Sequence, residues 1–407
     1  MHMKKNIFIL ITLTLFFIGC GGGGKTDTSD KSSQITISKV KPTVNFYVEN
    51  SGSMFGYVTE GSGNDFDRSL SSLLTQMTVS GYTDSLNMSY INSDIFHRDV
   101  EIPTFIKEIT KTNQFQGNLG STDMCQLFET ITSTVDDNNV SIMVSDCIFS
   151  PGKGVNAMNY IGAEKDCITL KLHEKVKNQD LAFVVYRMIS NFKGIYYDCH
   201  DNRTTINNDR PYFIWIVGTK ENIAELNKKG LEDKIEGRLE NSYTIFNSDD
   251  KPSYAVQFSP TIGSFDHGGP SKITKAKPEG ESGLFMFTVA VDFSSLLLDD
   301  DYLTNADNYN VRIPNYNIEI MRKQIGKYTH EIRVNTSSKY ISPVKLSIQL
   351  KNNIPSWIED YSDDACTHIK TDGMMEKTYG LKHLVDGIYS AYNFRNDVLA
   401  EITIDIN

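Results

Sequence analysis

Short apolar runs alternate with amphipathic segments through the first half of the chain, between residues 42 and 229. The runs are apolar on consecutive positions, as buried parallel strands tend to be. The segments between them carry apolar residues at helical spacing, as at Phe66, Leu70 and Leu73. This alternation predicts an α/β fold with a doubly wound, mostly parallel sheet. The predicted strands cover residues 43–48, 87–91, 141–145, 181–187 and 212–217.

The hydrophobic pattern changes to a period of two after about residue 230. The run from Phe285 to Phe293 places an apolar side chain at every second position, which is the pattern of a strand with one buried face. Similar runs cover residues 311–320, 344–350 and 398–406, and one amphipathic segment at 381–388 predicts a short helix. We therefore expect a β-rich, sandwich-like domain over 230–407, after an α/β domain over 41–229.

The N-terminus predicts export and lipid attachment. Lys4 and Lys5 precede an apolar run that ends in Phe-Ile-Gly-Cys, and this ending is similar to a bacterial lipobox with Cys20 as the acylated residue. The run is shorter than the ~20 residues of a membrane-spanning helix, although an uncleaved anchor helix is the alternative. Residues 1–20 are thus interpreted as a signal peptide, and the polar, Gly-rich residues 21–40 as a flexible tether.

Charge and cysteine content narrow the class of protein further. The formal net charge of −11 argues against nucleic acid as a partner, because phosphate binding requires clustered Lys and Arg. Five cysteines follow Cys20, an odd number without a C-x-x-C spacing, so we expect no disulfide framework.

The expected location is the cell envelope, with the outer membrane favoured over the inner and the body in the periplasm or at the surface.

Short oxygen-bearing side chains follow the first predicted strand. Glu49, Ser51 and Ser53 come directly after it, in the segment Glu-Asn-Ser-Gly-Ser. Ligands gather at the carboxyl ends of strands in open α/β sheets. Hydroxyl and carboxylate oxygens favour Mg²⁺, Mn²⁺ or Ca²⁺ over softer metals. Thr122, which opens a predicted helix, and Asp146, which ends a predicted strand, are two further candidates.

This set of segments resembles the metal-binding motifs of the von Willebrand factor A domain, which begin with D-x-S-x-S and read E-x-S-x-S here. The resemblance covers residues 41–229 and implies a Rossmann-like domain. It also implies that Ser51, Ser53 and Thr122 bind the metal directly, whereas Glu49 and Asp146 act through water and hydrogen bonds. An acidic side chain of a protein partner would complete the coordination.

The resemblance therefore predicts metal-assisted protein binding or assembly, and no enzymatic activity. One alternative is a metal-free structural scaffold in a cell-envelope assembly, in which the serines only satisfy backbone groups in a tight turn. A hydrolase is a further alternative, with Ser51 or Ser53 as the nucleophile or with the metal activating water. The sequence around Ser53 lacks the G-x-S-x-G spacing of a nucleophile elbow, which argues against the serine nucleophile.

Overall fold

The computed structural model describes residues 41–407 apart from 59–62, 116–118, 121, 249–250, 281, 339 and 394–396. The expected signal peptide 1–20, the acylation site Cys20 and the tether 21–40 lie outside the described residues. Within the described part, no helix combines the length and the apolar character needed to cross a membrane.

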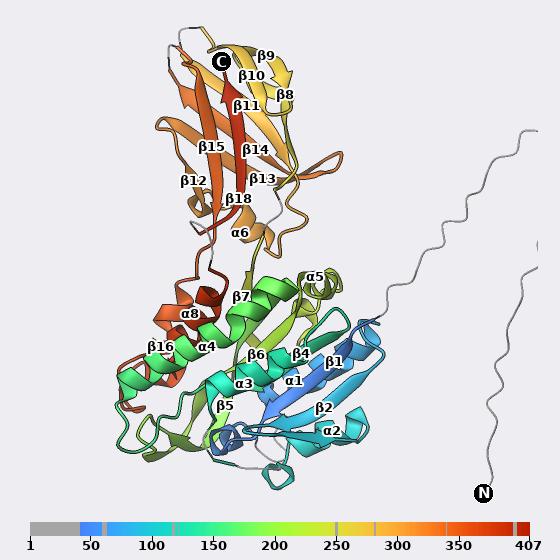
Figure 1. Cartoon of the computed structure of the whole chain (residues 1–407), viewed down its shortest axis with the longest axis vertical. Coiled ribbons are helices and arrows are strands. Elements are labelled where there is room, and N and C mark those ends of the chain that lie inside the picture. Colours follow the sequence, from blue (N-terminus) through green and yellow to red (C-terminus); the bar gives the residue numbers. More distant parts are fainter. Residues whose placement is uncertain are drawn as a thin grey trace, which may run out of the picture. The chain divides into compact units, whose positions relative to one another are not determined.

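A seven-stranded sheet forms the centre of the first half (Figure 1), in the order β3-β2-β1-β4-β6-β5-β7. Strand β1 pairs in parallel with β2 and with β4, and the other neighbours pair antiparallel. The strands are β1 (Thr43–Glu49), β2 (Leu86–Ile91), β3 (Ile95–Arg98), β4 (Asn139–Ser145), β5 (Leu181–Tyr197), β6 (Arg203–Thr219) and β7 (Arg238–Phe246).

The prediction of a doubly wound, mostly parallel sheet is wrong. Within the seven-stranded sheet only β1, β2 and β4 are parallel, and the chain as a whole is a strand-rich α/β protein with several sheets. The reason lies between the predicted strands 181–187 and 212–217, where no helix intervenes to carry the chain back across the sheet. Both strands instead continue into a long hairpin with a short loop at residues 198–202. Such a connection joins antiparallel neighbours.

Helices cover both faces of this sheet. On β6, Trp215 contacts Phe128 of α3, whereas Tyr212, three positions earlier, contacts Phe66 of α1. Residues an odd number of positions apart on a strand point to opposite faces, so α1 and α3 lie on opposite sides. The helical elements here are η1 (Gly52–Gly56), α1 (Asp65–Val79), α2 (Ile102–Ile109), η2 (Thr112–Gln114), α3 (Met124–Ser133), α4 (Ala157–Gln179), α5 (Lys220–Lys228) and η3 (Glu232–Lys234).

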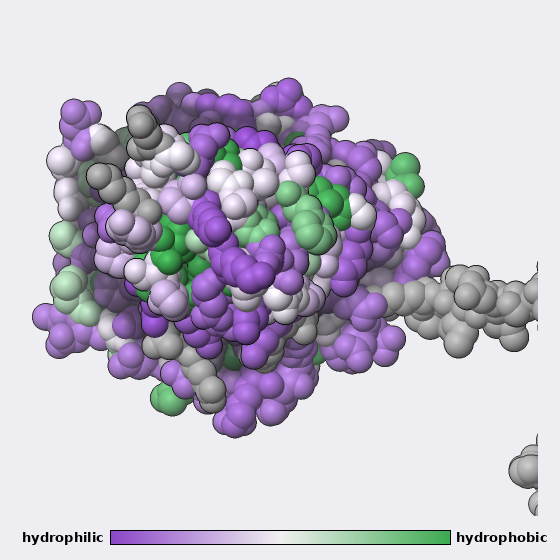
Figure 2. Space-filling model, turned by 90° about the horizontal axis from the view of Figure 1, so that it is seen from above, coloured by the Kyte–Doolittle hydropathy of each residue, from purple (hydrophilic) through white to green (hydrophobic). Residues whose placement is uncertain are grey.

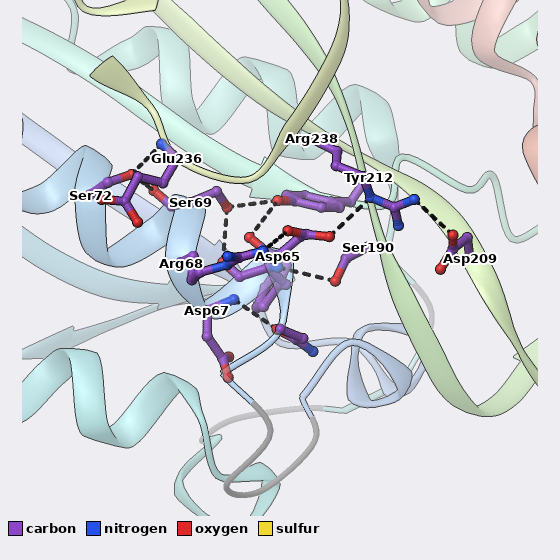
Figure 3. A network of polar contacts seen from close by, with 12 residues as sticks. Asp65, Asp67, Arg68, Ser69, Ser72, Ser190, Asp209, Tyr212, Glu236 and Arg238 are labelled. Carbon is purple, nitrogen blue, oxygen red and sulfur yellow. Dashed lines mark hydrogen bonds and ion pairs between the residues drawn. The ribbon is translucent and has the colours of Figure 1, made fainter. Parts of the chain in front are cut away.

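The start of α1 is tied to β5, β6 and β7 by polar contacts (Figure 3). The Ser69 hydroxyl lies 2.6 Å from the Tyr212 hydroxyl, and the backbone N–H of Phe66 donates to Ser190 Oγ at 3.0 Å. Arg238 donates to Asp65 Oδ2 at 2.9 Å. Because these partners come from three strands, they fix the helix at a defined position beside the loop that follows β1.

The second half contains two facing sheets, with the orders β13-β14-β11-β8 and β12-β15-β18-β10-β9. The predicted burial of Phe285, Phe287, Val289 and Val291 along β11 is confirmed, since all four are fully buried. The prediction that only one face of this strand is buried is wrong, because Thr288 and Ala290 on the other face are fully buried as well. The Tyr254 hydroxyl of β8 donates to Thr403 O of β18 and links the two sheets. The elements are β8 (Tyr254–Ile262), β9 (Ser264–Gly269), β10 (Lys272–Lys277), β11 (Leu284–Val291), α6 (Asp300–Thr304), η4 (Ala306–Asn308), β12 (Tyr309–Val311), β13 (Tyr316–Ile325), β14 (Tyr328–Ser337), β15 (Val344–Lys351) and β18 (Val398–Ile406).

The segment between β15 and β18 returns to the α/β part. It contains the predicted helix, α8 (Leu381–Ala391), which lies against α4 (Figure 1). The other elements of the segment are α7 (Trp357–Asp360), β16 (Ser362–Asp363), η5 (Met374–Glu376) and β17 (Thr378–Tyr379). Contacts gather Val40–Asn407 into one compact unit. The division at residues 229 and 230 therefore stays a prediction.

Candidate functional site

The polar segments singled out in the sequence meet at one edge of the seven-stranded sheet. Strands β1 and β4 run in parallel, and Val48 pairs with Val144, so Glu49 and Ser145 end the two strands side by side. The chain then turns away from each strand and presents Ser51, Ser53 and Asp146 at the same edge.

Glu49 is buried, with 1% of its surface exposed, and both of its carboxylate oxygens accept hydrogen bonds. Thr122 Oγ1 donates to Oε1 at 2.5 Å, and the Ser145 hydroxyl donates to Oε2. Burial raises the pKa of Glu49, while the hydrogen bonds from the hydroxyl groups oppose this rise. Glu49 therefore connects the N-terminal end of α3 to the ends of β1 and β4.

Asp146 is a second buried carboxyl group beside Glu49. Its Oδ1 accepts from the backbone N–H of Ile148 at 3.3 Å, whereas Oδ2 is buried without a hydrogen-bond partner of regular geometry. Burial, followed by the charge of Glu49, raises the pKa of Asp146 to about 7, and the Ser53 hydroxyl and the more distant charge of Arg210 lower it. A buried acceptor left open in this way favours a ligand that supplies positive charge.

Ser51 and Ser53 bring two hydroxyl groups to the wall of an adjoining cavity of about 740 Å³. Their Oγ atoms lie 2.8 Å apart, so one donates to the other. Each hydroxyl oxygen has two lone pairs and can accept or coordinate beyond this bond. Thr122 and Glu49 line the same cavity, whereas Asp146 lies beneath it with 2% of its surface exposed.

The rim of this cavity carries both signs of charge. Lys153 and Arg203 are exposed and line it, together with Asp201 and Tyr197. Arg203 lies over the Tyr197 ring at 5.5 Å from the ring centroid. Lys153 and Arg203 outnumber Asp201 at the rim, so the rim carries one net positive charge, which favours the approach of an anionic group from solvent.

The loop 198–202 at the tip of the β5–β6 hairpin forms part of this rim. Asp198 accepts from the backbone N–H groups of His200 and Asn202, both at 2.9 Å. A disulfide between Cys199 and Cys366 ties the loop to the segment between β15 and β18. These bonds fix the backbone that carries Asp201 and Asn202 into the cavity.

The prediction that the chain has no disulfide framework is wrong. Besides the bond at Cys199, Cys125 of α3 pairs with Cys167 of α4, and the remaining described cysteine, Cys147, is free and buried. The paired residues are 42 and 167 positions apart, distances at which sequence spacing carries no information on proximity. Disulfides persist in oxidising compartments, so they favour a location outside the cytoplasm.

The Cys199–Cys366 disulfide also determines whether the one cluster of His and Cys among the described residues can bind a metal. Cys199, His200 and Cys366 place their ligand atoms within 4.8 Å of one another. The two cysteine sulfur atoms form a disulfide with each other, whereas a metal binds cysteine as a free thiolate. The cluster in this state therefore does not provide a set of metal ligands.

The oxygen atoms at the sheet edge suit a hard divalent cation better. Ser51 and Ser53 offer a hydroxyl pair, and Asp146 offers an unpartnered carboxylate oxygen nearby. No Lys or Arg within the described ranges makes an ion pair with either Glu49 or Asp146. Two buried carboxyl groups without such a partner are costly to ionise together, and a divalent cation would compensate both charges.

Sequence reasoning missed Ser145, which donates to Glu49. Ser145 ends the predicted strand 141–145, but its nearness to Glu49 follows only from the parallel pairing of this strand with β1. Polar residues at the ends of adjacent parallel strands are expected to be neighbours.

Comparison of the chain with family models, with curated proteins and with solved structures found no match. The likeness to the A-domain motifs consequently rests on the residues of the five candidate positions alone.

Proposed function

We propose that the protein is a lipid-anchored, extracytoplasmic binding protein, which uses a divalent cation at the edge of the seven-stranded sheet to bind an acidic group of a protein partner. The buried pair Glu49 and Asp146 is the main observation in favour of the cation, because Asp146 Oδ2 is buried without a hydrogen bond of regular geometry among the described residues. The hydroxyls of Ser51, Ser53 and Thr122 would contact a Mg²⁺, Mn²⁺ or Ca²⁺ ion directly.

In this proposal, Glu49 positions the site and does not bind the ion itself. Its two oxygens already accept from Thr122 and Ser145, which holds the Thr122 hydroxyl in place. Asp146 would bind through Oδ2 or through water. The ion would draw a carboxylate of the partner to the cavity, and Lys153 and Arg203 at the rim would steer it there.

The anchor is the second component of the proposal. A lipid on Cys20 would hold the body at a membrane, and the disulfides support a location outside the cytoplasm. Metabolic labelling with radioactive palmitate tests the anchor directly. Label should appear in the parent chain and disappear in Cys20→Ala, and equal labelling of both would overturn this component.

Calorimetric titration of the full chain in detergent with Mg²⁺, and then with Mn²⁺, tests the cation site. We expect saturable binding that the double variant Ser51→Ala, Ser53→Ala abolishes, because the variant removes two of the proposed ligands. The control is Ser294→Ala, Ser295→Ala, which removes two exposed hydroxyls from a loop of the second half. Equal cation affinity in the parent and the first variant would refute the assignment, and absence of binding in every form would favour a metal-free scaffold.

The role of the partner's acid is tested with a blocked triglutamate peptide. Binding should require the cation and vanish with a chelator, and Lys153→Ala, Arg203→Ala should weaken peptide binding without changing cation affinity. Peptide affinity that is equal with and without cation would contradict the proposed mode of binding.

A further inference from the structure

A second cavity, of about 810 Å³, lies between the β7 edge of the seven-stranded sheet and the base of the β-rich half. One wall comes from β7 and from η3, and the facing wall comes from the segments 297–302 and 352–357. Its volume falls within the ~300–1,000 Å³ that is usual for ligand pockets. It shares no lining residue with the cavity of the proposed cation site, and its ligand is independent of the cation.

The charged residues that line this cavity are all acidic: Glu232, Asp233, Glu240, Asp299 and Asp301. None of the five takes part in an ion pair among the described residues. The pKa of Glu232 is raised by partial removal from water and then by the charges of Asp299 and Asp233, whereas the hydroxyl of Ser242 lowers it. Carboxylates from both walls therefore face one another across the cavity.

Two hydrogen-bonding groups in the cavity wall have no partner. Asn352 lines the cavity with 7% of its surface exposed, and its Nδ2 is buried without a hydrogen bond. The Tyr243 hydroxyl, on the β7 wall, is buried and unpartnered as well. Buried donors without partners are rare in folded proteins, and these two favour a ligand with acceptor atoms.

Aromatic side chains complete the lining. Tyr186 and Trp357 are buried in the wall, and Tyr302 is held in place by its hydroxyl, which donates to Lys351 O at 2.8 Å. The faces of Tyr and Trp rings attract ammonium and guanidinium groups, and they also pack against the methylene groups of long side chains.

We infer that this cavity binds a basic peptide segment of a protein partner. Carboxylates and aromatic rings fit the ammonium or guanidinium group and the aliphatic stem of a Lys or Arg side chain. The donors of Asn352 and Tyr243 fit the carbonyl oxygens of the peptide backbone, which a simple metal cation or a polyamine does not possess. The acidic, aromatic lining and the two donors without partners together favour a basic peptide over a metal cation or a polyamine.

Fluorescence anisotropy of the full chain with a labelled trilysine peptide, blocked at both ends, tests the inference. We expect saturable binding, and no binding of the same peptide with acetylated lysines. Glu232→Gln, Asp233→Asn should weaken the affinity by about tenfold, because it removes two charge-assisted contacts. Tyr243→Phe should weaken it by about three- to tenfold, the range for one hydrogen bond, and disturbs no bond of the free protein.

The net charge of −11 makes non-specific attraction the main rival explanation. The matched control is therefore Asp166→Asn, Glu174→Gln, which neutralises one exposed Asp and one exposed Glu on α4. This control should change the affinity by less than about twofold. An equal loss in the control and in Glu232→Gln, Asp233→Asn would overturn the inference, as would the absence of saturable trilysine binding at low salt.

Discussion

The length of the Glu49 side chain explains how one residue organises the candidate site. The A-domain motif has aspartate at this position, and glutamate adds one methylene group. In this structure the longer side chain reaches both Thr122 and Ser145, which come from different elements. The departure from the motif thus has a structural role, while the hydroxyls of Ser51 and Ser53 line the cavity together with Glu49 and Thr122.

Glu49→Asp should destabilise the protein by about 1–3 kcal/mol, because the shorter side chain cannot satisfy both buried hydroxyl donors. Urea unfolding followed by circular dichroism measures the change. Glu174→Asp, at an exposed position on α4, should leave the stability within about 0.5 kcal/mol of the parent. An unchanged midpoint for Glu49→Asp would show that neither bond contributes.

Asp67, in the first turn of α1, gives the protein a pH-dependent stability. Its side chain is buried without a partner at Oδ1, and burial raises its pKa from 3.8 to about 6. The raised pKa means that the folded state binds the proton more tightly than the unfolded state does. The stabilisation that protonated Asp67 contributes to the folded state is therefore complete below about pH 4, and it is lost as the pH rises through 6.

Asp67→Asn should remove this dependence. Relative to the parent, the variant should gain stability as the pH rises from 4 to 7, and urea unfolding at four or five pH values measures the difference. For Asp94→Asn, at an exposed position, the difference in stability from the parent should stay constant over the same pH range. A flat difference for Asp67→Asn would contradict the raised pKa.

The five candidate residues could be selected from the sequence because the ends of strands and helices are recognisable from single positions, and the structure brings these residues to one edge of the sheet. Glu49 and Asp146 follow runs of apolar residues, and Thr122 precedes a helical pattern. The partner Ser145 was missed, since it is the last residue of the predicted strand and only the register shows that it lies beside Glu49.

The positions of the strands were predicted more accurately than the connections between them. The apolar cores of β5 and β6 were recognised, but not their extension into a hairpin of seventeen residues on each side. The extension between 188 and 211 contains polar residues such as Asn191 and Asn207, which mark exposed positions of a hairpin that projects past the sheet. Parallel order was inferred from apolar runs alone, and such runs also occur in buried antiparallel strands.

The disulfide at the tip of this hairpin should control the rim of the candidate site. Cys199→Ser, Cys366→Ser should increase the amide hydrogen exchange of residues 198–203, because the loop loses its tie to the segment after β15. Cys125→Ser, Cys167→Ser removes the other disulfide, between α3 and α4, and should leave exchange in this loop unchanged. Equal protection of the loop in both variants would contradict a positioning role for Cys199.

The packing of α8 on α4 joins the C-terminal half to the α/β part. A Cβ atom at Gly387 would lie 3.0 Å from Lys165 O and 3.2 Å from Ile168 Cβ, so the two helices approach closely only because this residue is glycine. The helical period of 381–388 predicted the helix, but periodicity carries no information on the layer against which a helix packs.

Gly387→Val should destabilise the protein by about 1–3 kcal/mol through overpacking. Gly162→Val is the matched control on α4, since a Cβ atom there meets nothing within 4 Å. It should be neutral or slightly stabilising, because valine favours the helix more than glycine does. Thermal unfolding of both variants measures the difference, and equal melting temperatures would contradict the close contact.

At the scale of the whole molecule, one face can be followed in Figure 2. Hydrophilic residues dominate the face drawn in Figure 2, and hydrophobic residues there lie in small, separate groups. This face offers no broad apolar area of the kind that marks a large obligate interface. Binding through the two polar cavities is consistent with that distribution.

Soaking crystals of the protein in Mn²⁺ and recording anomalous scattering tests the central claim most directly. We predict one strong peak at about 2 Å from the hydroxyl oxygens of Ser51 and Ser53, in the cavity above Asp146. A peak confined to other residues, or the absence of any peak at this edge of the sheet, would contradict the assignment of a cation site.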